Sequence, residues 1–153
     1  ARKAADFVKF CDAFDIPVLT LTNATGFMAT LCSEKMMAKS VGELVAAFAD
    51  ATVPKVNVII GKAYGTAYVA MNSKSIGADL VYAWDNAEIG MMDADLAAKI
   101  MYRELQNGVA SAAARGYVDT VISPADTRKY VIGAFEMLFT KREDRPSKKH
   151  GTV

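Results

Sequence analysis

The stretch GKAYGTAYVAMNSKSIGADLVYAW, residues 61–84, follows directly on the apolar segment VNVII, residues 56–60. The apolar segment shows little alternation of polar and apolar residues, which is typical of a buried parallel strand. Gly61, Gly65, Thr66 and Ala67 then place little side-chain volume where this predicted strand gives way to a helix predicted over 65–74. Small residues at such a turn allow another group to approach the backbone closely.

Apolar spacing on both sides of this stretch predicts a chain that alternates helices and strands. The sequence predicts helices over 4–15, 33–51, 65–74, 93–102 and 123–138, and strands over 17–23, 56–60, 78–84, 87–92 and 117–123. This order predicts an α/β fold in which helices cover the faces of a sheet. One junction lacks turn residues, because no glycine or proline lies between Tyr102 and Gly108. Either one helix continues through this junction, or a segment is absent near 102–108.

Composition excludes several classes of function. The chain has 153 residues, the size of one domain, and a net charge of +1, which argues against a nucleic-acid-binding surface. Two cysteines without a CxxC spacing and a single histidine predict no zinc cluster and no Ser-His-Asp triad. No long apolar run and no signal peptide are found, so a cytoplasmic location is predicted. Because the helical residue pattern begins at residue 1 without an N-terminal cap, we expect the chain to be part of a longer polypeptide.

Two predicted strands end in sequences made of small residues. Residues 17–23 lead into Gly26 and Phe27, and residues 56–60 lead toward Gly65, Thr66 and Ala67. The first amides of a helix lack backbone partners, and two such amides can stabilise a developing oxygen anion. Small residues at a strand-to-helix turn also allow a helix to pack closely on its sheet. From the residues alone, both interpretations stay open.

Other candidates for chemistry have simpler explanations. Glu88 and Asp93 could form an acid–base pair, although Asp93 is placed to cap the helix that follows it. Lys62 follows a glycine as in a phosphate loop, but the earlier glycine of that motif is missing, so we reject this reading. Tyr64 and Tyr68 flank the glycine turn and either line a pocket or pack against it.

Long segments of the sequence resemble one enzyme family. The segments are residues 51–84, ATVPKVNVIIGKAYGTAYVAMNSKSIGADLVYAW, and residues 114–151, ARGYVDTVISPADTRKYVIGAFEMLFTKREDRPSKKHG, with CDAFDIPVLTLTNATGF at 11–27. They are similar to the C-terminal domain of the carboxyltransferase subunit of biotin-dependent enzymes, the propionyl-CoA and methylmalonyl-CoA carboxyltransferase family with its decarboxylase relatives. The resemblance covers nearly the whole chain.

The resemblance implies a crotonase-like fold, a spiral of β-β-α units, with residues 1–153 as the second of two such domains in a subunit. It implies an enzyme that transfers a carboxyl group between carboxybiotin and the α-carbon of a short-chain acyl-CoA, with backbone oxyanion holes, no side-chain nucleophile and no metal. The implied catalytic residues are Gly26, Phe27, Gly65, Thr66 and Ala67, and the implied biotin-binding residues are Gly26, Phe27, Tyr64, Thr66 and Ala67.

The implied partners are the N-terminal carboxyltransferase domain of the same or a neighbouring subunit, the biotin carboxyl carrier protein and further copies of the chain. A membrane partner is implied only if the enzyme is a sodium-pumping decarboxylase. Val69 stands where many propionyl-CoA relatives carry an acid associated with the choice of acyl group, so Val69 is a candidate determinant of acyl specificity. The alternatives are a decarboxylase chain, a crotonase-type hydratase or isomerase, and a non-catalytic module that docks the biotin carrier.

Overall fold

The computed structural model describes residues 1–101 and 107–143. The elements follow the order that the sequence predicts, with the addition of the helix α5. They are α1 (Arg2–Ala13), β1 (Val18–Ala24), α2 (Leu31–Asp50), β2 (Lys55–Tyr64), α3 (Gly65–Ala70), η1 (Lys74–Ile76), β3 (Leu80–Trp84), β4 (Glu88–Gly90), α4 (Ala94–Met101), α5 (Val109–Ala114), β5 (Thr120–Ile122), η2 (Pro124–Asp126) and α6 (Thr127–Met137). The segment that we suspected to be missing near 102–108 lies mostly outside the described residues.

The strands form a parallel sheet in the order β1-β2-β3-β5. β2 is the longest strand and pairs with two partners in succession. Its first half, Val56–Ile59, pairs with β3, and its last three residues, from Lys62 to Tyr64, pair with β4. β4 therefore lies beside the end of β2, where the chain enters α3.

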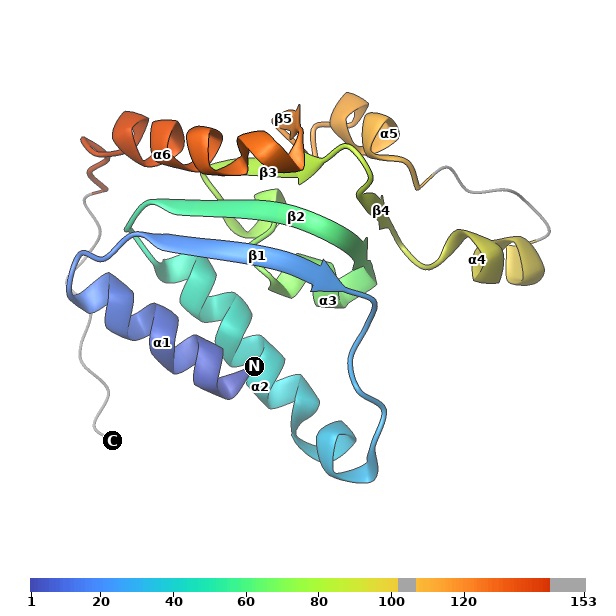
Figure 1. Ribbon diagram of the computed structural model, residues 1–153. Helices are drawn as coiled ribbons and strands as arrows, with labels where there is room; N and C mark the ends of the chain where they lie inside the picture. The colour runs from blue at the N-terminus through green and yellow to red at the C-terminus, as the bar shows by residue number, and fades with distance from the viewer. Residues whose placement is uncertain (102–106, 144–153) are drawn as a thin grey trace.

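Helices cover both faces of the sheet (Figure 1). On one face, α1 and α2 pack together and bury Val8 and Cys11 against Leu44 and Phe48. On the other face, α6 covers Val56, Val58, Tyr82 and Ile122. Alternate residues of β2 point to opposite faces, so Ile59 belongs to a third cluster with Val81 and Ala83 on β3. The predicted α/β architecture is confirmed.

Several element boundaries differ from the sequence prediction for identifiable physical reasons. α2 begins at Leu31, two residues before the predicted start at Ser33, because Thr30 is its N-cap. The Thr30 hydroxyl accepts a hydrogen bond from the Ser33 amide, and the Ser33 hydroxyl accepts one from the Thr30 amide. The predicted helix over 65–74 ends at Ala70, and a separate short 3₁₀ helix begins at Lys74. The predicted strand over 117–123 is shorter, at Thr120–Ile122.

Within the described ranges, no helix is both long and apolar enough to cross a membrane. The same residues contain no group of three histidine, cysteine or acidic side chains arranged to hold a metal ion.

Candidate functional site

The two small-residue segments singled out in the sequence meet at one edge of the sheet. β1 and β2 run parallel, and Ala24 near the end of β1 pairs with Ala63 near the end of β2. Gly26 and Phe27 leave β1 at this edge, and the turn into α3 leaves β2 beside them. The parallel pairing therefore places Gly26 and Phe27 at the same edge of the sheet as Thr66 and Ala67.

The turn from β2 into α3 requires a glycine at position 65. Gly65 has φ +56°, a left-handed conformation that costs other residues energy. A Cβ at this position would also lie 3.0 Å from the backbone oxygen of Met91, the residue that follows β4. Thr66 is exposed, whereas Ala67 is buried with its side chain directed into the protein. The turn therefore presents little side-chain volume to the solvent.

Gly61 plays a different role from the one predicted. It lies inside β2 rather than in the turn, because β2 continues to Tyr64. The group that approaches its backbone is the side chain of Asn23, whose Oδ1 accepts a hydrogen bond of 3.0 Å from the Lys62 amide. A Cβ at position 61 would lie 2.8 Å from that Oδ1 atom. The small residue at 61 is thus explained by packing between β1 and β2, while the open turn begins at Gly65.

Tyr64 and Tyr68 are both buried, but their hydroxyl groups differ. The Tyr64 hydroxyl donates a hydrogen bond to Glu88 Oε2 on β4, and burial, followed by the interaction with Glu88, raises the pKa of Tyr64 well above its ordinary value. The Tyr68 hydroxyl is buried without a hydrogen-bond partner among the described residues, and burial raises its pKa to about 12. Of the two tyrosines, only Tyr64 is linked to polar groups near the turn.

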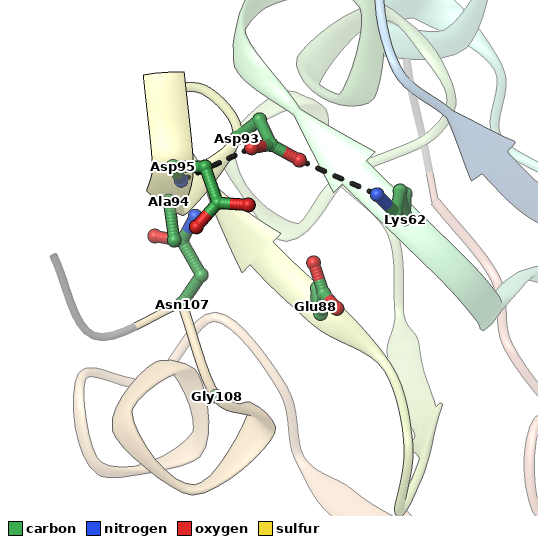
Figure 2. A pocket seen from close by; sticks show the side chains of 7 residues that line it. All are labelled: Lys62, Glu88, Asp93, Ala94, Asp95, Asn107 and Gly108. Atoms are coloured by element: carbon green, nitrogen blue, oxygen red, sulfur yellow. Dashed lines mark hydrogen bonds and ion pairs between the residues drawn. The ribbon is translucent and has the colours of Figure 1, made fainter. Parts of the chain in front are cut away.

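A cavity of about 420 Å³ lies beside β4 and is bordered by Lys62 of β2 (Figure 2). It is lined by Lys62, Glu88, Asp93, Ala94, Asp95, Asn107 and Gly108. Figure 2 shows Lys62 reaching from β2 toward Asp93 ahead of α4, and their charged groups lie 3.3 Å apart. This hydrogen bond from Lys62 lowers the pKa of Asp93. Asp93 also caps α4, since its Oδ1 accepts from the Asp95 amide at 3.1 Å, which confirms the predicted capping role.

The sequence marks Glu88 and Asp93 as candidates but does not predict this cavity. Lys62 lines the cavity although it is no part of a phosphate loop, and no sequence motif points to Asn107. The signal for Lys62 was the alternation along β2, which places Lys62 and Tyr64 on the face of the strand opposite to the buried Ala63. Val69 is partly exposed on α3 and does not line the cavity.

Known proteins are similar to this chain over its whole length. The model of the carboxyl transferase domain family matches residues 1–107 and 104–153. The propionyl-CoA carboxylase beta chain of Saccharopolyspora erythraea is 43% identical over 179 residues, which cover 100% of this chain and 33% of that protein. The alpha subunit of methylmalonyl-CoA decarboxylase from Veillonella parvula is 40% identical over 165 residues, which cover 99% of this chain and 32% of that protein.

A solved structure extends the likeness to three dimensions. The crystal structure of the transcarboxylase 12S hexamer, with methylmalonyl-coenzyme A and methylmalonic acid bound, matches with a TM-score of 0.91 and 41% identity. The match covers 99% of this chain and 33% of that one. The fold is therefore the crotonase-like fold of acyl-CoA carboxyltransferases.

The chain belongs to the carboxyl transferase domain family, as the resemblance in its sequence indicated. It spans about a third of the length of the curated relatives that it matches.

Proposed function

We propose that this chain is the biotin-side, C-terminal domain of an acyl-CoA carboxyltransferase. In this proposal the backbone amides of the β2–α3 turn, at Thr66 and Ala67, donate hydrogen bonds to the ureido oxygen of biotin, and Gly26 and Phe27 border the same position. Biotin, carried covalently on a partner domain, would supply the carboxyl group that is transferred to or from the α-carbon of a short-chain acyl-CoA.

The observation that carries the proposal is the meeting of the two small-residue segments at one sheet edge. Amides that are fixed in place before reaction stabilise developing negative charge without the cost of reorienting solvent, and one such donor is worth about 3 kcal/mol in measured cases. The site offers room for a ligand, because a Cβ added to Gly26 would meet nothing within 4 Å. Gly65 gives the turn its left-handed backbone without adding a side chain. These features fit a ureido group that is bound by main-chain atoms.

The rest of the active site would come from other domains. The proposed partners are an N-terminal carboxyltransferase domain that holds the acyl-CoA, the biotin carboxyl carrier protein and further copies of the chain. Exposed phenylalanines support such contacts, two on α1 at Phe7 and Phe10 and one at its C-cap, Phe14, since large exposed apolar side chains often mark surfaces that partners cover. The transcarboxylase 12S neighbour is itself a hexamer. A cytoplasmic location remains part of the proposal.

The direction of transfer has two candidates, because both a carboxylase chain and a decarboxylase chain are relatives at similar identity. We propose carboxyl transfer as the shared chemistry and the decarboxylase as the alternative use of it. Val69 remains our proposed determinant of acyl specificity. It lies on α3, the helix that follows the turn, and its side chain is 37% exposed.

Substitutions in the turn, made in the complete subunit that contains this chain, test the proposal. Ala67→Val adds volume to a buried side chain at the turn and should displace the donor amide, lowering kcat by about 10²- to 10³-fold. Ala70→Val is the matched control, since Ala70 is also buried in α3 but lies one turn beyond the donors. Thr66→Gly keeps the amide and should cause a much smaller loss.

The opposite ranking would contradict the proposal. If Thr66→Gly abolished carboxyl transfer in a folded enzyme while Ala67→Val was tolerated, the threonine hydroxyl would be the working group. Equal losses in Ala67→Val and Ala70→Val would assign the effect to core packing instead of the donor amides.

A further inference from the structure

Tyr64 links the turn at Gly65–Ala67 to the neighbouring strand β4. It is the last residue of β2 and the N-cap of α3, so it directly precedes Gly65. Its side chain is 4% exposed, and its hydroxyl donates to Glu88 Oε2. The amides of Thr66 and Ala67 follow within three residues, so a rotation of the backbone at Tyr64 would change where they point.

β4 contacts the turn at two positions. Within the β2–β4 pairing, Lys62 lies opposite Glu88 and Tyr64 lies opposite Gly90. The Glu88 carboxylate holds the Tyr64 side chain, and the backbone oxygen of Met91, one residue beyond β4, lies 3.0 Å from where a Cβ of Gly65 would be. β4 therefore pairs with the residue before the left-handed glycine, and the residue after β4 leaves no room for a side chain on the glycine itself.

Charged groups lie near the Tyr64–Glu88 contact. The Lys62 ammonium lies 5.8 Å from the centre of the Tyr64 ring and pairs with Asp93 across the cavity. A hydrogen bond between a hydroxyl and a carboxylate is stronger than one between two neutral groups, and the Tyr64–Glu88 bond is partly buried. The contact is thus suited to hold one geometry instead of a set of alternatives.

We propose that Glu88 is a positioning residue, which orients the donor amides of the Gly65–Ala67 turn through its hydrogen bond with the Tyr64 hydroxyl. This role rests on the proposed function and adds a residue to it. In this role Glu88 touches neither substrate nor biotin and transfers no proton. Its effect passes through Tyr64, in contrast to the acid–base role that the sequence left open for Glu88.

Kinetics of four variants of the complete subunit test this role. Tyr64→Phe and Glu88→Leu should each lower kcat by about 10- to 100-fold, as expected for the loss of a hydrogen bond to a charged group, with the KM for acyl-CoA unchanged. Glu88→Gln keeps an acceptor oxygen and should lose much less than Glu88→Leu. The double variant Tyr64→Phe/Glu88→Leu should lose no more than either single variant, because both remove the same bond.

Tyr82→Phe is the matched control, because Tyr82 is also a buried tyrosine but lies on β3, where its ring packs edge-on against Tyr130. It should keep the wild-type kcat. An unchanged kcat in Tyr64→Phe would overturn the positioning role. Multiplied losses in the double variant would also overturn it, as would a loss in Glu88→Gln equal to that in Glu88→Leu, which would indicate direct proton transfer.

A second measurement separates this inference from the proposed function. Amide hydrogen exchange of the peptide that spans 64–70 should become at least severalfold faster in Tyr64→Phe and stay unchanged in Tyr82→Phe, whether or not the wild-type subunit transfers carboxyl groups. If exchange is faster in Tyr64→Phe but the wild-type subunit transfers no carboxyl group, only the proposed function is rejected. Unchanged exchange in Tyr64→Phe would reject the positioning role itself.

Discussion

Replacing Gly65 by alanine tests the turn on which the site depends. Gly65 has φ +56°, a conformation that costs a residue with a Cβ about 1–2 kcal/mol. The added Cβ would lie 3.0 Å from the Met91 carbonyl oxygen, and relieving such crowding costs about 1–3 kcal/mol. Alanine also restricts the unfolded chain, which returns about 0.4–1 kcal/mol. The net destabilisation of Gly65→Ala should be about 1–4 kcal/mol, with a central value of about 3 kcal/mol.

Gly116→Ala isolates the contribution of the contact with Met91. Gly116 also has a left-handed backbone, with φ +79°, but a Cβ there would meet nothing within 4 Å. Its replacement should cost only about 1 kcal/mol, the conformational part alone. Urea unfolding followed by the fluorescence of Trp84, the chain's only tryptophan, would measure both variants. Equal destabilisation by the two substitutions would refute the packing of β4 against the turn.

Three further predictions concern stability. Lys62→Met should lower the free energy of unfolding at neutral pH. Because Lys62 lowers the pKa of Asp93 in the folded protein, the stability difference between wild type and Lys62→Met should be complete above the ordinary aspartate pKa. It should vanish as the pH falls through the lowered pKa of Asp93. A difference that stays constant down to pH 2 in urea titrations would contradict the ion pair. Ile59→Ala should cost about 2–5 kcal/mol in the same assay, since Ile59 is fully buried, and a cost below 1 kcal/mol would be against it. Asp12→Ala removes the acceptor for the Thr52 amide and hydroxyl, so calorimetry should show a loss of about 1–3 kcal/mol, and an unchanged melting temperature would count against the bond.

The order of elements could be predicted because it depends on local patterns. Residues 56–60 are apolar apart from Asn57, as is typical of a buried parallel strand, and the Asp93 cap marks the start of α4 correctly. The end of β2 could not be predicted, since Gly61 and Lys62 have the composition of a turn. They remain in the strand because they contact Asn23 on β1 and Glu88 on β4, which are distant in the sequence. Strand pairing thus overrode the local preference.

The candidate site was likewise only partly predictable from the sequence. Small residues singled out the Gly65–Ala67 turn and the Gly26 segment in the sequence, and the parallel pairing of β1 and β2 in the structure places both at one edge of the sheet. The Tyr64–Glu88 contact depends on the register between β2 and β4, which no local pattern encodes. The open interpretation of Tyr64, lining a pocket or packing, is therefore answered by a specific partner that only the fold reveals.

The most direct test of the central claim is carboxyl transfer by the complete subunit between methylmalonyl-CoA labelled in its free carboxyl group and unlabelled biotin. We predict that the label appears in carboxybiotin, that Ala67→Val reduces its rate by about 10²-fold or more while Ala70→Val does not, and that residues 1–153 alone show no transfer. Transfer at the wild-type rate by Ala67→Val, or by the 153-residue chain alone, would contradict the assignment of this chain as the biotin-side half of the site.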